Sequence, residues 1–277
     1  FHQEKMGNLK ESYLNYRKLH IKYPNHERTP DAEIAIKKIL KYPGVRKVPL
    51  SIREHTERIE KLFKAVRFKE IIDEIEGIKK NNSPMPGRFY IFLSNAHRGL
   101  RDRKTANIAL KEFAKLYPNH NQIQKAKFNI GRNLWNLGKP IAGAKYFKEV
   151  ANDKPSSERA VKALFFLGKI YEERKNYSEA LKTYQETLNK YPFDFYGQWA
   201  GWRLGWVNYI NGKFKKAFEC FQDVAQRFSK GPFIEYNLYW SAKSAEKIGN
   251  KEKAREIFMD VANLYPYTFH GIRARGK

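Results

Sequence analysis

The sequence predicts an all-α protein, an α-solenoid or superhelix in which helical hairpins stack side by side. Three observations predict it. A pattern of small and large apolar residues recurs every 37 residues between positions 94 and 266. The stretch from Glu4 to Pro24 has the same length as that from Glu246 to Pro266, and both end on Tyr-Pro. The alternation of apolar and polar residues that is typical of β-strands does not emerge in the sequence.

The period is clearest in five successive units. Twelve residues after a small residue in the first helix comes a second small residue, and a large apolar residue follows at sixteen. A proline ends the second helix in four of the units, while the fourth unit has Ser229 there and Gly231-Pro232 slightly later. Small residues let two antiparallel helices approach closely, and proline cannot continue a helix. The small residues of the first helices are Ser94, Gly131, Gly168, Gly205 and Ala242.

This spacing resembles that of the tetratricopeptide repeat, with about three extra residues between units. Residues 81–277 are predicted to hold five regular tetratricopeptide-like repeats and an exit segment. Residues 1–80 are predicted to form irregular N-terminal hairpins, which gives about seven hairpins in all. Among them is a helix that begins near Thr29, with Thr29 as its N-cap. Since Phe1 is not a start methionine, we expect the N-terminus and any targeting signal to be missing from this sequence.

Composition favours an anionic partner. Lys and Arg number 54 against 29 Asp and Glu, a formal net charge of +25. The sequence leaves open a second explanation, a Lys-rich coding bias that yields a solvated basic surface. The mean hydropathy of −0.73 and the lack of a long apolar run predict no membrane span. With one cysteine, Cys220, neither an intrachain disulfide nor a Cys-based zinc site is expected.

No catalytic, metal or cofactor site is predicted. The sequence has no glycine-rich phosphate loop, no nucleophile elbow and no pair of histidines at ligand spacing on one helix face. The seven histidines are scattered, and His20 takes the place of a repeat alanine, as a packed side chain would. We therefore assign no catalytic residue.

The first helices of such repeats line a concave face, which is the predicted binding surface. Positions six and three before each small residue, and one and four after it, share one side of the helix. Aromatic side chains there suit the faces of sugars, and cations suit carboxylates. The alternative, that the aromatics pack against neighbouring helices, stays open. The predicted ligand-binding residues are Arg88, Arg98, Lys125, Arg132, Trp135, Lys162, Lys169, Trp199, Trp202, Trp206, Tyr209, Tyr236 and Lys243.

The last stretch, 239–277, resembles the end of the superhelical region of the soluble lytic murein transglycosylases. The resemblance rests on Tyr239-Trp240, Gly249, Ala254, Tyr265-Pro266 and the junction Thr268-Phe269-His270-Gly271. It implies a periplasmic enzyme that cleaves peptidoglycan through a lysozyme-like catalytic domain, which is not in this chain. The parent protein would then be a lyase, and this chain its non-catalytic scaffold, holding anionic glycan strands or cell-envelope partners.

Two rivals to that interpretation remain. The first is an envelope tetratricopeptide scaffold that binds peptides or proteins and has no enzyme activity. The second is a nucleic-acid binder that uses basic rows and stacking aromatics, and the absence of a recognised nucleic-acid motif speaks against it. We expect no nucleic acid among the partners. Oligomeric state, and whether the superhelix closes into a ring, do not follow from the sequence.

Overall fold

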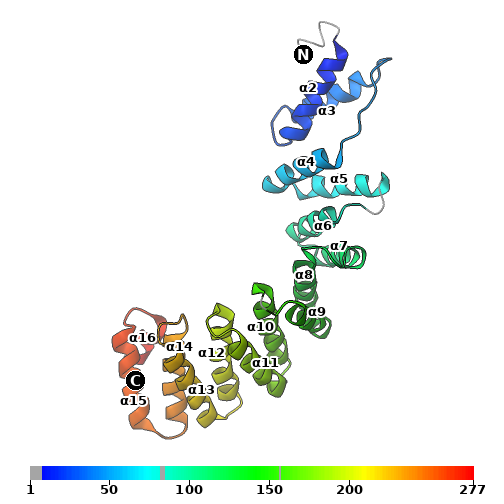
Figure 1. Ribbon diagram of the computed structural model, residues 1–277. Helices are drawn as coiled ribbons and strands as arrows, with labels where there is room; N and C mark the ends of the chain where they lie inside the picture. The colour runs from blue at the N-terminus through cyan, green and yellow to red at the C-terminus, as the bar shows by residue number, and fades with distance from the viewer. Residues whose placement is uncertain (1–7, 82–84, 156) are drawn as a thin grey trace. The chain divides into compact units, whose positions relative to one another are not determined.

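A computed structural model describes residues 8–81, 85–155 and 157–277, and all regular structure within these ranges is helical (Figure 1). The predicted fold class, an all-α solenoid of tetratricopeptide-like hairpins, is confirmed. Residues 4–7 of the repeated opening stretch lie outside the described ranges. The helices are α2 (Leu9–Lys22), α3 (Thr29–Ile39), α4 (Ile52–Lys64), α5 (Phe68–Asn81), α6 (Gly87–Gly99), α7 (Arg103–Leu116), α8 (Ile123–Asn136), α9 (Pro140–Asp153), α10 (Glu158–Glu173), α11 (Tyr177–Lys190), α12 (Phe195–Ile210), α13 (Phe214–Arg227), α14 (Ile234–Lys247), α15 (Lys251–Leu264) and α16 (Phe269–Ala274).

The chain divides into two compact units, residues 1–126 and 127–277, called unit 1 and unit 2 below. Each is described by itself. The sequence predicts a different division, at residue 80, because the repeats become regular after it. That division concerns the repeat pattern and stays a prediction.

In unit 2 the second helices α11 and α13 each pack between two first helices: α11 contacts α10 and α12, and α13 contacts α12 and α14. The first helices also contact one another directly, α10 with α12 and α12 with α14. Figure 1 shows α10, α12 and α14 on one side of the unit and α11, α13 and α15 on the other. The close approach of the first helices makes theirs the inner face of the stack.

The small residues act as predicted. A Cβ atom at Gly168 would lie 2.6 Å from the ring of Tyr184, and one at Gly205 would lie 2.4 Å from the ring of Phe221. Tyr184 and Phe221 are fully buried. These two hairpins therefore close by placing an aromatic ring of the second helix over a glycine of the first.

The turn inside each hairpin uses one backbone conformation. Seven residues after the small position, six hairpins have a residue with a left-handed φ between 58° and 85°. In three of the hairpins the next residue is an Asp or Asn whose side chain accepts a backbone N–H and starts the second helix, as Asn176 does from Glu179. The left-handed residues are Val66, Arg101, Gly138, Lys175, Gly212 and Gly249.

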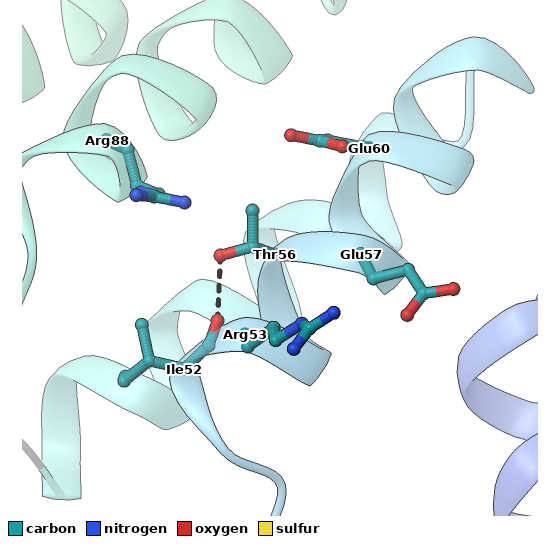
Figure 2. Close-up of a pocket in the computed structure, with 6 residues that line it drawn as sticks. All are labelled: Ile52, Arg53, Thr56, Glu57, Glu60 and Arg88. Atoms are coloured by element: carbon teal, nitrogen blue, oxygen red, sulfur yellow. Dashed lines mark hydrogen bonds between the residues drawn. The ribbon is translucent and has the colours of Figure 1, made fainter.

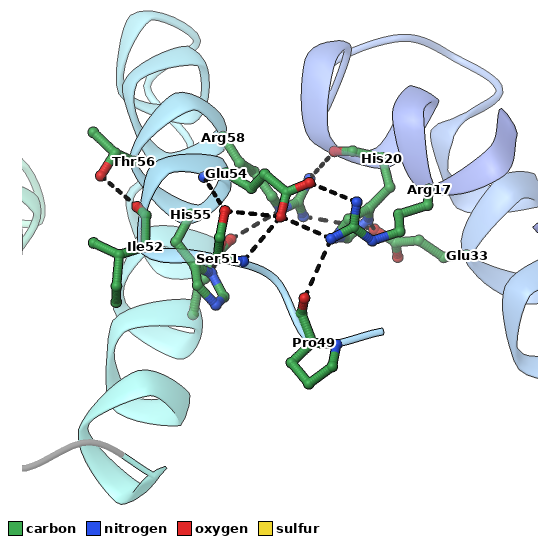
Figure 3. Close-up of polar contacts among 11 residues, drawn as sticks. Arg17, His20, Glu33, Pro49, Ser51, Ile52, Glu54, His55, Thr56 and Arg58 are labelled. Atoms are coloured by element: carbon green, nitrogen blue, oxygen red, sulfur yellow. Dashed lines mark hydrogen bonds and ion pairs between the residues drawn. The ribbon is translucent and has the colours of Figure 1, made fainter. Parts of the chain in front are cut away.

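In unit 1, charged side chains tie the first hairpin to the second (Figure 3). Arg17 of α2 donates from Nη2 to Oε2 of Glu54 at 2.7 Å and to the carbonyl of Pro49 at 3.2 Å. Buried Arg58 of α4 donates from Nε to Glu74 at 2.9 Å and from Nη1 to the carbonyl of His20 at 2.7 Å. The bonds from Arg17 to Glu54 and from Arg58 to His20 therefore join α2 to α4.

The start of α3 differs by one residue from the prediction. Arg28 is the N-cap, and Thr29 lies inside the helix with Pro30 in its first turn. The hydroxyl of Thr29 donates to the carbonyl of Tyr23 at 2.6 Å instead of accepting an N–H at the helix start. Thr29 therefore fixes the preceding turn.

Arg17→Gln is expected to flatten the acid dependence of the stability of unit 1. Hydrogen bonding to Arg17 lowers the pKa of Glu54 from 4.5 to about 2. Because the folded pKa lies below the ordinary value, the stabilisation is complete above pH 4.5 and is lost as the pH falls toward 2. Tm is to be measured over this range for wild type, Arg17→Gln and the matched control Lys18→Gln, which removes an exposed charge from the same helix. Identical slopes for all three proteins would contradict the role given to this pair.

Candidate functional site

The predicted site residues fall into both units. Arg88, Arg98 and Lys125 belong to unit 1, and the others to unit 2. The two parts are therefore described as separate surfaces.

Unit 1 has a pocket of about 480 Å³ between α4 and α6, the first helices of two successive hairpins. Figure 2 shows Arg88 of α6 facing α4 across it. The hydroxyl of Thr56 is bonded to the carbonyl of Ile52 at 2.7 Å, so it is engaged within its own helix. Two arginines and two glutamates give the pocket a mixed charge. Its lining residues are Ile52, Arg53, Thr56, Glu57, Glu60 and Arg88.

The α4 side of this pocket is absent from the predicted set. Arg53, Thr56 and Glu60 stand six before, three before and one after Ile59, the position that is small in the regular repeats. Ile59 is fully buried but large, so the pattern of small residues does not include it. Counting the repeat backward from Ile71, which takes the place of a repeat alanine, would have found them. Of the remaining predictions in unit 1, Arg98 and Lys125 are exposed and do not line the pocket.

In unit 2, five aromatic residues form a surface that we call the aromatic face. Trp202 and Trp206 stack with ring centroids 5.7 Å apart, and Trp206 and Tyr209 stack at 6.1 Å. Trp240 of α14 meets Trp206 edge-on at 4.8 Å and Tyr209 at 5.0 Å. Tyr236, also from α14, meets Trp202 edge-on at 6.2 Å and is 39% exposed. The other four are half-buried.

The helical period explains this alignment. Positions 202, 206 and 209 are separated by four and three residues, so they share one side of α12. Ala200, Leu204 and Val207 on the other sides of the helix are buried. Trp240 is a site residue that the sequence count missed, because it stands two before Ala242. It reaches the face because α14 packs directly against α12.

Trp199 and Trp135, both predicted for the site, lie elsewhere. The ring of Trp199 packs 4.5 Å from that of buried Phe165 and stacks on Phe233 at 5.9 Å, within the core around α11 and α12. Trp135 of α8 donates from Nε1 to Glu173 at 2.8 Å. For Trp199, packing is therefore the main role. The same holds for Phe128, Phe165 and Tyr239, which occupy the position three before the small residue and are all buried.

Acids of the same helix neutralise most of the predicted cations in unit 2. Lys162 pairs with Glu158, and Lys243 pairs with Glu246. Lys169 lies 3.9 Å from Glu173, and burial, helped by the charge of Arg203, lowers its pKa. Arg132 is exposed, and no ion pair involves it in the described part of the chain. The cationic rows are thus weaker than a count of residues suggests.

An ion pair between Arg203 and Glu172, with little exposure to solvent, lies next to the aromatic face. Arg203 of α12 donates from Nε to Oε2 of Glu172 of α10 at 2.9 Å and from Nη2 to Oε1, and the hydroxyl of Tyr184 donates to Oε2 at 2.8 Å. Burial lowers the pKa of Arg203 to about 10, so the side chain remains charged at neutral pH. Its guanidinium carbon lies 5.2 Å from the ring of Trp202. The sequence count missed Arg203, which stands two before Gly205.

Metal clusters and membrane-spanning helices are not found in the described part of the chain. Across residues 8–81, 85–155 and 157–277, no three His, Cys, Asp or Glu side chains gather where they could bind a metal ion. No helix in the same ranges combines the length and apolar character needed to span a bilayer. Cys220 is half-buried, and burial raises the pKa of its thiol.

Comparison with known sequences finds the tetratricopeptide repeat. Two models of this repeat match, one over residues 128–195 and one over residues 236–266, both in unit 2. Comparison with curated proteins gives no match.

Solved structures show the same fold at low identity. PilW, described as a widely conserved type IV pilus biogenesis factor, is 17% identical, with a TM-score of 0.51 over 80% of this chain and 96% of its own. MamA from Desulfovibrio magneticus RS-1 is 20% identical, with a TM-score of 0.51 over 66% of this chain and 97% of its own. A kinesin light chain-like repeat protein from Podosopora anserina is 13% identical, with a TM-score of 0.50 over 64% and 95%.

The predicted resemblance to soluble lytic murein transglycosylases is wrong. The comparisons point to tetratricopeptide repeats, and nothing in them points to that enzyme family. Two of the glycines that carried the resemblance are required by the repeat geometry. Gly249 is a left-handed turn residue, and a Cβ at Gly271 would lie 1.8 Å from the carbonyl oxygen of Tyr265, as one at Gly197 would lie 1.7 Å from that of Tyr191. The chain is a helical-repeat protein built from tetratricopeptide-like hairpins.

Proposed function

We propose that the chain is a scaffold whose aromatic face binds an extended segment of a partner protein. The aromatic face carries this proposal. Five half-buried or exposed Trp and Tyr rings lie together on the inner side of a repeat stack, the side that repeat arrays commonly use for binding. Trp and Tyr give large contact area at small cost in side-chain entropy, and they dominate the energetics of protein interfaces.

The chemistry of the face favours apolar and proline side chains. Stacked indole and phenol rings present flat apolar surfaces of the kind that holds proline-rich segments in other aromatic-lined grooves. The lysines around it are paired with acids, so they add little net attraction for a polyanion. Support for a peptidoglycan strand came from the resemblance that the comparisons overturn. The periplasmic location came from the same resemblance and stays a prediction.

Trp206→Leu is expected to weaken binding at least tenfold, about 1.4 kcal/mol, while leaving Tm within a few degrees of wild type. Leucine keeps the apolar contact with the helix but removes the flat ring that stacks between Trp202 and Tyr209. Binding is to be measured on an array of immobilised twelve-residue peptides, including proline-rich ones, with a chitin oligomer and an oligo-dT strand as further probes.

Trp199→Leu is the matched control. It removes the same side chain from the same helix but from the core, so Tm should fall while peptide affinity is kept. If no peptide binds, or if the oligo-dT or the chitin oligomer binds with the same dependence on Trp206, the proposal of a protein partner is wrong.

A further inference from the structure

Besides the pocket of unit 1, the structure has a pocket in unit 2 that we call the basic pocket. It lies away from the aromatic face. Its volume is about 470 Å³, and it lies between one side of α9 and the end of α10 with the turn that follows it. The α9 wall includes Ile141, Lys145 and Lys148, which recur about once per turn and are exposed. The opposite wall includes Tyr171 and Arg174. No residue of the basic pocket belongs to the aromatic face.

The charge of this pocket is not neutralised by its own helices. Lys145 and Arg174 form no ion pair with any residue of the described ranges, in contrast to Lys162 and Lys243 of the first helices. Lys148 lies 5.8 Å from the ring centre of Tyr171, and interaction with Tyr171, aided by the charge of Glu179, raises its pKa. Glu149 also lines the pocket, but it is held 3.2 Å from Lys127.

The floor of the pocket is apolar. Ile170 is 1% exposed and Ala144 is 8% exposed, while Ile141 at the rim is 66% exposed. A large apolar side chain that stays this open beside unpaired cations suits a ligand that brings apolar and anionic groups together. Such a ligand would cover Ile141 and neutralise the lysines in one step.

The arrangement of the cations indicates an extended ligand. The α9 wall runs from Ile141 to Asn152, a rise of about 16 Å, which equals roughly five residues of extended chain. Lys145 and Lys148 stand about one turn apart on this wall, and Arg174 lies on the other wall. A single phosphate would need the three groups to converge, whereas carboxylates spaced along a strand can meet each of them separately.

We propose that the basic pocket binds an acidic segment of a partner protein, in which large apolar side chains are interspersed among Glu or Asp residues. The carboxylates pair with Lys145, Lys148 and Arg174, and the apolar side chains cover Ile141 and the floor. This site is independent of the aromatic face, so the scaffold would hold two segments of different chemistry on two sides of unit 2.

The test uses a fluorescent, end-capped hexapeptide of sequence Glu-Leu-Glu-Glu-Leu-Glu, with binding followed by anisotropy at physiological ionic strength. Lys145→Gln with Lys148→Gln is expected to raise Kd at least tenfold. The matched control is Lys215→Gln with Lys216→Gln, which removes the same charge from exposed positions of α13 and is expected to change Kd less than about twofold. Replacing both leucines of the probe by serine should also weaken binding, because the apolar floor then has no partner.

Several results would overturn the proposal. Equal losses in the two double variants would mean attraction to net charge alone. An oligo-dT strand that binds as tightly as the peptide, with the same dependence on Lys145 and Lys148, would assign the pocket to nucleic acid. Absence of any peptide binding would show that the pocket takes no acidic segment. Trp206→Leu should leave this binding unchanged, so failure here and failure of the aromatic face are distinguished.

Discussion

Arg203→Met is expected to lower the free energy of unfolding of unit 2 by about 3–5 kcal/mol, a fall in Tm on the order of 10 °C. The side chains of Arg203 and Glu172 are 12% and 9% exposed, and they join two neighbouring first helices. Methionine fills much of the arginine volume but leaves the carboxylate of Glu172 buried with only the Tyr184 hydroxyl as a partner. Most of the loss is the cost of that uncompensated charge.

Thermal unfolding followed by circular dichroism measures this effect. The control is Arg227→Met, because Arg227 pairs with Asp223 at the surface, where the two side chains are 42% and 59% exposed. Its expected change is within about 0.5 kcal/mol. Adding Glu172→Gln to Arg203→Met should restore part of the stability, since the buried charge is then removed. Equal effects of Arg203→Met and Arg227→Met would show that burial adds nothing to the Arg203 pair.

Gly197→Ala is the second substitution with a large expected effect. A Cβ atom there would lie 1.7 Å from the carbonyl oxygen of Tyr191, a backbone atom that cannot move without disturbing the turn between α11 and α12. Overpacking of this kind costs about 1–3 kcal/mol, or more where backbone must shift. The expected result is a Tm well below that of wild type, with the loss confined to unit 2.

Gly77→Ala is the matched control for this substitution. Gly77 lies within α5, and an added Cβ would have nothing within 4 Å. Alanine in place of glycine inside a helix stabilises it by about 0.5–1 kcal/mol, so Tm should rise slightly. A fall of Tm for Gly77→Ala as large as that for Gly197→Ala would contradict the steric explanation.

The fold could be predicted because one requirement recurs in every hairpin. A buried ring of the second helix, such as Tyr184 or Phe221, can pack against the first helix only where that helix has a glycine or another small residue. That requirement leaves a period in the sequence. The N-terminal hairpins were harder, because Arg17, Arg58 and their glutamates hold them together through contacts 16 to 37 residues apart that leave no period.

The candidate site was predicted only in part. Helical spacing brought Trp202, Trp206 and Tyr209 together correctly, because that alignment is local to one helix. Trp240 reaches the face from the next repeat, and the offset between two helices cannot be counted along one of them. Charge was overestimated for a different reason, since the acids that neutralise these lysines lie on the same helices. Whether a lysine is free depends on where a glutamate one turn away points, and composition does not carry this information.

The shared turn of the hairpins bears on how the length of such a chain can change. From Val66 to Gly249 the backbone reverses direction through the same left-handed step, each time at the same place in the repeat. When a whole 37-residue segment is duplicated or lost, each remaining repeat keeps its turn at the same position. Each repeat then still packs against its neighbours through contacts of the same type. Insertion or loss of part of a repeat would shift the reversal away from the glycine–aromatic pair that it serves. The array can therefore grow or shrink in whole steps, while the aromatic face and the basic pocket keep their local geometry.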